Sequence, residues 1–280
     1  MADTAFQIQF RQEHLYGYEQ TKSILRDSVT TEAVIKGNQA TFLVADSGNA
    51  EAVTRGINGR IPGRADNLNQ PVVTLEEWHD VTEKTSFNIF SSQGNQRAIM
   101  SQTSLATINR KLDQQIIDAL DTATQVSAVT GQATLQMVLS AMQVLTENEV
   151  KFDGQICAAI SPAFLLNLIK LNEFTNADYI KRQPIPGADP MWMDEQGYYD
   201  WLGVKWMVHT RLPGATTNAE TCYMYHKTST GHAAPSNLLM TDVGYEGRDD
   251  YSYVRSTIFS GAALLQNTGV VKMMHDATTI

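Results

Sequence analysis

The chain has 280 residues, of which 42% are hydrophobic, 18% charged and 8% aromatic, a composition typical of a globular protein with one or two sizeable cores. Its 21 basic and 30 acidic residues give a net charge of −9, which argues against a protein that holds nucleic acid by charge. Because it has two cysteines, no run of 18 apolar residues and no signal-peptide pattern, we expect a soluble cytoplasmic product without a disulfide framework.

The first 30 residues form a polar N-terminal arm. Residues 1–28 are rich in Gln and Tyr and contain few apolar side chains, with a hint of a short helix at Leu15, Tyr18, Lys22 and Leu25. Such a segment buries little surface by itself. We expect it to lie along another surface or to stay mobile, and to add little to the core of its own subunit.

A β-rich segment follows, from residue 31 to residue 95. Ala33–Lys36 and Thr41–Val44 are apolar, partly β-branched runs, and the Gly37-Asn38 dipeptide between them favours a turn. Pro71–Leu75 and Thr85–Phe90 are predicted to be the returning strands. The segment has few large apolar side chains, so we expect a projection that needs a partner rather than an independent domain.

The tip of this projection is predicted at Arg55–Arg64, where three glycines separate the arginines Arg55, Arg60 and Arg64. Glycine provides conformational freedom, and loops often carry binding residues. An anion-binding loop would need a nucleotide-binding glycine pattern followed by a helix, and the sequence has neither. We therefore predict that the three arginines contact another subunit. The acidic stretches around Asp194-Glu195 and at Asp242–Asp250 are alternative partners.

Residues 96–123 are predicted to form a long α-helix around which the rest of the chain is organised. No proline occurs between Pro71 and Pro162, and Asn95 is a candidate N-cap. At 1.5 Å per residue the helix would be about 40 Å long. A second helix is predicted at Thr134–Glu147, and we group residues 96–150 as one unit. The apolar stripe of the long helix consists of Ala98, Leu105, Ile108, Leu112, Ile116, Leu120 and Ala123.

A mixed α/β lobe is predicted for residues 151–240, because strand and helix signals alternate there. Ser161-Pro162 is typical of a helix start, with serine as the cap and proline in the first turn. Residues 241–280 are expected to be strands that return to the long helix. The predicted strands are Ile156–Ile160, Leu202–His209 and Thr221–His226 in the lobe, and Tyr251–Phe259 and Gly269–His275 after it.

The sequence contains none of the common catalytic or phosphate-binding motifs that would indicate an enzymatic reaction. There is no Gly-x-Ser-x-Gly elbow, no phosphate-binding loop and no His-Glu-x-x-His. Cys222, His226 and His232 are the only group that resembles metal ligands, and no fourth ligand stands near them. We therefore predict no catalytic residues, no metal site and no cofactor.

Two further clusters have ordinary interpretations. The carboxylates at Asp189–Asp200 and Asp242–Asp250 lack the spacing of a calcium loop, which favours a solvated surface or a subunit contact. Aromatic residues gather in the same region without interleaved Lys or Arg, which favours a core or an interface over base stacking. These aromatic residues are Trp192, Tyr198, Tyr199, Trp201 and Trp206.

The order of these parts resembles that of the tailed-phage major capsid proteins, which share the Hong-Kong-97-type fold. The resemblance covers nearly the whole chain and is closest to the small capsid proteins, through the helix runs Arg97–Met100 and Asp113–Leu120. It implies an α+β fold in which residues 31–95 are the extended loop that reaches over a neighbouring subunit. Residues 96–150, together with the returning strands, would be the peripheral domain, and residues 151–240 the axial domain.

The resemblance implies a non-enzymatic protein that assembles through pentamers and hexamers into an icosahedral shell. The shell would enclose double-stranded DNA without sequence-specific binding, in the virion, after synthesis in the host bacterial cytoplasm. Its partners would be copies of itself, the portal, and separate scaffolding or decoration proteins, with no membrane. Because the arm is short, we expect no fused scaffolding segment.

In some members of this family, a lysine of the extended loop forms an isopeptide bond with an asparagine of a neighbouring subunit. The loop's lysines here are Lys36 and Lys84, neither near the tip, and Asn267 is the conceivable acceptor, so we predict shells without this crosslink. Two alternatives remain: an encapsulin-like nanocompartment around a cargo enzyme, and an α/β enzyme or sugar-binding protein with an unrecognised site. The contents and the mass of purified particles would distinguish them.

Overall fold

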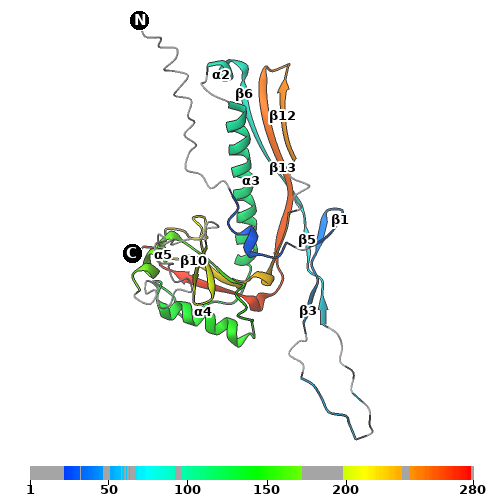
Figure 1. Cartoon of the computed structure of the whole chain (residues 1–280), viewed down its shortest axis with the longest axis vertical. Coiled ribbons are helices and arrows are strands. Elements are labelled where there is room, and N and C mark those ends of the chain that lie inside the picture. Colours follow the sequence, from blue (N-terminus) through cyan, green and yellow to red (C-terminus); the bar gives the residue numbers. More distant parts are fainter. Residues whose placement is uncertain are drawn as a thin grey trace, which may run out of the picture.

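The computed structural model describes residues 22–31, 33–46, 51–57, 59, 61, 63, 67–91, 96–171, 198–234 and 240–278. These parts form an elongated molecule (Figure 1). A long helix lies beside long strands, a lobe of sheet and helices sits near the C-terminal end of that helix, and a narrow β projection extends away from both (Figure 1).

The predicted long helix is α3, Gln96–Asp121, whose 26 residues correspond to a length of about 39 Å. It packs along β13 (Tyr251–Leu264), which pairs antiparallel with β6 (Glu76–Thr85) on one edge. The other edge of β13 pairs with β12 (Met240–Glu246) and with β11 (Thr230–Ala233). The helix stripe is buried as expected from Ile108 onward, whereas Leu105 is half-buried and Ala98 is exposed. Ile108 and Leu112 form one core cluster with Ile258 of β13, and Trp78 packs against it.

The prediction of a strand at Thr85–Phe90 is wrong. The strand β6 ends at Thr85, and α2 (Ser86–Ser91) begins there. The Thr85 hydroxyl accepts a hydrogen bond from the Asn88 N–H, as helix-capping residues do, and the Ser86 N–H bonds to the Asp250 carbonyl. Phe87 is exposed, so the alternation of apolar and polar residues does not bury one face of a strand here.

The lobe is built on a five-stranded sheet with two helices. The strand β7 (Ile156–Ile160), predicted to be buried, runs parallel to β9, and the other pairings are antiparallel. The predicted caps are confirmed for α5 (Pro162–Ile169), where Ser161 accepts from the Phe164 N–H, and Thr134 caps α4 (Leu135–Glu147) in the same way. The strand order is β14 (Val270–His275), β10 (Glu220–His226), β7, β9 (Val204–Val208) and β8 (Tyr198–Trp201).

The last strand reaches the end of the long helix, where the Lys272 ammonium lies 3.0 Å from the Asp121 carboxylate, but it does not pair with the strands that lie along that helix. Instead, β14 is an edge strand of the five-stranded sheet, with Cys222 of β10 opposite Met273. The helix α4, which we had grouped with the long helix, packs against β14 in the same lobe. Apolar patterning indicates that such a strand is buried, but it does not tell which sheet edge the strand joins.

The segment before the projection contributes to the core, contrary to our expectation for the arm. Leu25 and Val29, on either side of the short helix η1 (Arg26–Ser28), are buried in the same cluster as the five-stranded sheet. Thr30 then bonds to β11 through the Thr230 carbonyl and the His232 N–H. The segment has few apolar residues, but these two both point inward.

The projection consists of two small antiparallel sheets. Gly37 adopts φ +63° in the turn between β1 and β2, which confirms the predicted turn. Thr41–Val44 is not one strand, because Phe42 turns inward between β2 and β3 and packs against Gly231, where a Cβ would lie 2.7 Å from the ring. The strands are β1 (Val34–Lys36), β2 (Gln39–Thr41), β5 (Val72–Thr74), β3 (Val44–Asp46) and β4 (Asn67–Asn69), with two further short helices, η2 (Lys227–Ser229) and η4 (Asn267–Gly269), elsewhere in the chain.

Candidate contact sites

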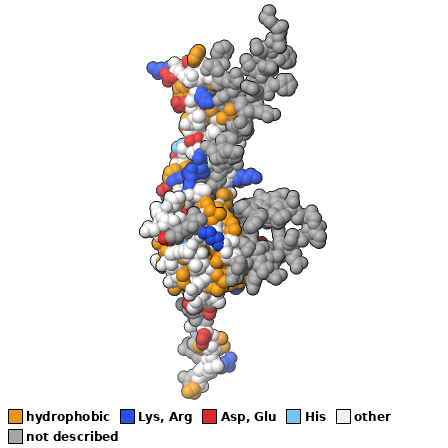
Figure 2. Space-filling model, turned by 90° about the vertical axis from the view of Figure 1, so that its left-hand side faces the viewer, with side chains coloured by type: hydrophobic (Ala, Val, Ile, Leu, Met, Phe, Trp, Pro, Cys, Tyr) orange, Lys and Arg blue, Asp and Glu red, His pale blue; other side chains and the backbone are white. Residues whose placement is uncertain are grey.

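The projecting loop exposes apolar and charged side chains together (Figure 2). Val53, Arg55 and Ile57 are all exposed, and Ile57 is fully accessible at 107%. Arg55 has no hydrogen-bond or ion-pair partner among the described residues. Arg60 and Arg64, the other two predicted contact residues, lie outside the described part of the chain. Exposed apolar residues of this size beside an unpaired cation are typical of a surface that another molecule covers.

Of the two predicted acidic partners, only Asp242–Asp250 belongs to the described residues, and it is not near this loop within one subunit. Asp194 and Glu195 lie outside the described residues, and β12, which carries Asp242, lies at the opposite end of the molecule from the loop (Figure 1). Asp242 already lies 3.4 Å from Arg255, and Asp250 accepts from the Ser86 and Tyr245 hydroxyls. Asp242 and Asp250 are exposed, and within one subunit they do not reach Arg55.

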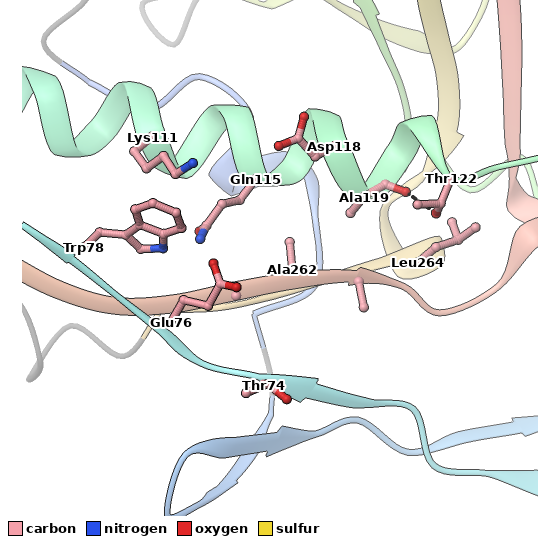
Figure 3. A pocket seen from close by; sticks show the side chains of 12 residues that line it. Thr74, Glu76, Trp78, Lys111, Gln115, Asp118, Ala119, Thr122, Ala262 and Leu264 are labelled. Atoms are coloured by element: carbon pink, nitrogen blue, oxygen red, sulfur yellow. Dashed lines mark hydrogen bonds between the residues drawn. The ribbon is translucent and has the colours of Figure 1, made fainter.

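A groove lies between the long helix and the root of the projection (Figure 3). Its volume is about 470 Å³, and the helix wall carries Lys111, Gln115 and Asp118. The Lys111 ammonium sits 3.7 Å from the centre of the Trp78 ring, a cation–π contact. Gln115 is held by Ser260, whose hydroxyl donates to its amide oxygen at 2.8 Å. The other residues that line the groove are Thr74, Glu76, Ala119, Thr122, Gly261, Ala262, Ala263 and Leu264.

Asp113 is the centre of a buried polar cluster on the long helix. Its carboxylate accepts hydrogen bonds from the Ser23 hydroxyl at 2.5 Å and from the Ile24 and Leu25 N–H groups at 3.2 Å. The His209 ring lies 3.5 Å away. Burial by itself raises the pKa of Asp113, but the hydrogen bonds from His209, Ser23 and the backbone outweigh it, and the pKa lies below its ordinary value. The cluster therefore holds an ionised carboxylate inside the protein.

His232 of β11 lies close to this cluster and is completely buried. Neither ring nitrogen has a hydrogen-bond partner within the described ranges. Burial and the Arg26 guanidinium lower the pKa of His232 to about 4, although Asp113 acts in the opposite direction. Arg26 itself donates to the Ala234 carbonyl at 2.7 Å. The imidazole is therefore neutral at pH 7.

A second buried cluster joins a hydroxyl, a carboxylate and an imidazole. The Ser161 hydroxyl donates to Glu220 Oε2 at 2.6 Å, and His275 Nδ1 lies 2.8 Å from the same oxygen. A catalytic triad would place the imidazole between the other two groups, whereas here the carboxylate is in the middle. All three side chains are buried, and Ser161 also caps α5. The arrangement ties β10, β14 and α5 together and offers no exposed nucleophile.

The three residues that resembled metal ligands are not brought together. Cys222 is buried in β10, where burial raises the pKa of its thiol well above the ordinary range. His226, at the end of the same strand, lies 3.2 Å from Asp153, and His232 belongs to the other sheet. Among the described residues, no three His, Cys, Asp or Glu side chains are placed to hold a metal ion.

Of the five aromatic residues named in the sequence analysis, Trp201 and Trp206 have described side chains, and both belong to a core. Trp201 and Trp206 are buried with ring centres 5.9 Å apart, and the Trp206 indole donates to the Trp201 carbonyl. This confirms the core interpretation for these two.

The described residues include no helix long and apolar enough to cross a bilayer.

Sequence reasoning missed both polar clusters. It placed Asp113 off the apolar stripe of the long helix, although the residue is completely buried. A carboxylate next to Leu112 on an amphipathic helix was the available signal, but its partners Ser23 and His209 are far away in the sequence.

Comparison with known proteins gives a consistent result. A family model described as phage capsid protein matches residues 2–277. No curated protein matches the chain.

Solved capsid structures share the fold at low sequence identity. The capsid protein of cyanophage P-SCSP1u superimposes with a TM-score of 0.70 at 12% identity, covering 95% of this chain and 91% of that one. A chain in the solved structure of Mycobacterium phage Che8 gives a TM-score of 0.69 at 14% identity, with 95% of each chain covered. The capsid of a native GTA particle gives 0.69 at 10% identity, covering 94% of this chain and 93% of the other.

Proposed function

The chain belongs to the phage capsid protein family and has the Hong-Kong-97-type fold, and from this premise we propose that it assembles through pentamers and hexamers into an icosahedral shell around double-stranded DNA. The family and the fold point to a structural, non-enzymatic protein. The observation that carries the proposal is the family match across residues 2–277. The elongated subunit, with a loop whose exposed side chains need a partner, supports it.

Each part of the subunit receives a role in this proposal. Residues 31–95 are the extended loop that reaches over a neighbour, and the residues before them form the N-terminal arm. The long helix with β6, β12 and β13 is the peripheral domain. The lobe on the five-stranded sheet is the axial domain, which meets its copies around the five-fold and six-fold positions. Since α4 and β14 pack within that lobe, we assign them to the axial domain.

The loop arginines Arg55, Arg60 and Arg64 contact an adjacent subunit in the assembled shell. Arginine suits such a contact because its planar guanidinium can hold a carboxylate through two hydrogen bonds. Replacing all three by alanine is expected to leave the circular dichroism spectrum and subunit melting nearly unchanged while lowering assembly yield. A triple variant that assembles into particles as robust as the parent's, or one that cannot fold, would count against this role.

In this proposal the shell encloses the genome without binding it through net positive charge. A net charge of −9 agrees with a container into which DNA is packed by a separate motor. The other partners we propose are the portal and separate scaffolding or decoration proteins. In this proposal the protein is made in the host bacterial cytoplasm and ends in the virion.

Expression of the chain followed by sedimentation and electron microscopy tests the assembly. The expected result is closed icosahedral particles of megadalton mass, or isolated pentamers and hexamers when the scaffold is missing. A stable small oligomer that forms neither would overturn the proposal. Particles purified from an infected or induced host should contain DNA, and a protein cargo in place of DNA would instead indicate a nanocompartment.

A further inference from the structure

We propose that the groove between α3 and the root of the projection receives residues 53–57 of the extended loop of a second copy. Arg55 would lie between the carboxylates of Glu76 and Asp118, and Ile57 would lie on the floor of the groove. The inference deepens the proposed function and rests on it, because copies of the chain must be in contact.

The walls of the groove suit a cation. Glu76 of β6 and Asp118 of α3 both line it and both are exposed, with Glu76 pointing toward the helix (Figure 3). The one basic residue in the lining, Lys111, is already held over the Trp78 ring. Gln114 donates to Asp118 at 2.8 Å, which fixes that carboxylate without neutralising its charge. A carboxylate on the helix and another on the strand can each accept hydrogen bonds from the planar guanidinium of an arginine.

The floor of the groove suits a branched apolar side chain. It consists of Ala119 on the helix and the run Gly261–Leu264 on β13, so small side chains leave room between the helix and the strand. Gly261 is required at this point, because a Cβ there would lie 2.7 Å from Val73 and 2.8 Å from the Thr74 carbonyl oxygen. The root of the loop therefore crosses β13 closely and forms one end of a fixed groove.

The loop carries the complementary chemistry. Within residues 51–57, two apolar side chains, Val53 and Ile57, flank the cation Arg55, and all three are exposed. The loop points away from the groove of its own subunit, so a second copy must supply the occupant (Figure 1). Burial of Ile57 and pairing of Arg55 would occur together, which makes the contact both apolar and charge-selective.

A charge exchange tests the contact. We expect Arg55→Glu to lower the assembly yield at least tenfold, and the double variant Glu76→Arg/Asp118→Arg to do the same. Combining the three changes should restore most of the yield, because the charges are again complementary. Lys36→Glu is the matched control, since it reverses an exposed cation on the same projection outside residues 53–57. Normal assembly of Arg55→Glu, or no recovery in the combined variant, would overturn the inference.

A cysteine pair tests the geometry directly. Ile57→Cys with Ala263→Cys should give covalent ladders of subunits after oxidation of assembled particles. The native Cys157 and Cys222 are buried and should therefore form no disulfide bonds during the oxidation. Ile57→Cys with Leu139→Cys, a change at an exposed position on α4, is the control that should give no ladder. Particles without a ladder would overturn the groove contact alone, whereas a parent chain that forms neither particles nor pentamers and hexamers would overturn the proposed function.

Discussion

The carboxylate of Asp113 and the imidazole of His209 face each other at 3.5 Å in the interior of the subunit. Asp113 lies on the long helix, whereas His209 directly follows β9 of the five-stranded sheet. The same carboxylate accepts three hydrogen bonds from residues 23–25. One buried anion therefore connects the long helix, the lobe on the five-stranded sheet and the residues just before the projection.

Asp113→Ala is expected to destabilise the subunit by about 3–5 kcal/mol, because it leaves buried donors without their acceptor. Chemical denaturation of subunits measures the loss. Asp118→Ala, five residues further along the helix and exposed, is the control and should change stability by no more than about 0.5 kcal/mol. Equal stabilities of the two variants would show that the cluster around Asp113 contributes nothing.

Stability should fall as the pH decreases from about 6.5 to 4, mainly through His232. Its pKa is lowered to about 4 in the folded state by burial and Arg26, with Asp113 opposing. Below the unfolded pKa of about 6.5 the unfolded chain binds a proton that the folded chain does not, so unfolding becomes more favourable. The cost is on the order of 3 kcal/mol at pH 4, since one pKa unit corresponds to about 1.4 kcal/mol.

Asp113 acts in a different pH range from His232. Its folded pKa lies below 3.8, so its contribution is present above that value and is lost as the pH falls through the lower folded pKa. Denaturant titrations of the parent and of His232→Asn between pH 7 and pH 4 separate the two groups. The slope of stability against pH should flatten in His232→Asn. An unchanged slope would mean that His232 does not carry the effect.

The sequence predicted best where one pattern decides the outcome locally. The stripe through Ile108 and Leu112 fixed the long helix and its buried face, and Ser161-Pro162 fixed the start of α5. Prediction from sequence failed where the contacting residue is far away in the chain. Nothing near Val270 shows that β14 pairs with β10, and nothing near Asp113 shows that the Ser23 hydroxyl donates a hydrogen bond to its carboxylate. Patterns of burial do not encode which buried surfaces meet.

The contact made by the loop could likewise be predicted only in part from the sequence. Glycines and arginines at the tip indicated a contact, and the structure describes Arg55 as exposed. The acidic runs near Asp194 and Asp242 stood out in the sequence because they are contiguous. The carboxylates Glu76 and Asp118 of the groove are 42 positions apart and become neighbours of one groove only through the fold.

The apolar stripe of the long helix should be a folding determinant. Leu112→Asp or Ile116→Asp places a carboxylate where the parent side chain is buried, which should cost several kcal/mol. Soluble yield and thermal melting measure the effect. Leu139→Asp, the same change at an exposed leucine of α4, should be tolerated. Soluble Leu112→Asp protein that assembles normally would contradict the packing of α3 on β13.

Mature shells should contain no isopeptide crosslinks between subunits. Asn267, the candidate acceptor, is engaged at both ends of its amide: its oxygen accepts from the Thr124 N–H, and its nitrogen donates to the Thr124 hydroxyl, each at 2.9 Å. Boiled particles should run as single subunits on a denaturing gel. A ladder that disappears in Asn267→Asp would reverse this prediction and identify the acceptor.

The N-terminal arm should separate folding from assembly at a boundary near Lys22. Deletion of residues 1–21 is expected to leave the cooperative thermal transition unchanged, because the segment is polar and the contacts to Asp113 begin at Ser23. Deletion of residues 1–29 should instead lower the melting temperature by several degrees or prevent folding, because it removes buried Leu25 and Val29 together with the donors to Asp113.

If the arm crosses a neighbouring subunit, the shorter deletion should still reduce the yield or the heat stability of particles. Calorimetry of subunits and electron microscopy of particles measure the two effects separately. Loss of the subunit transition in the shorter deletion would place the arm in the core, and robust particles from it would show that assembly does not use the arm.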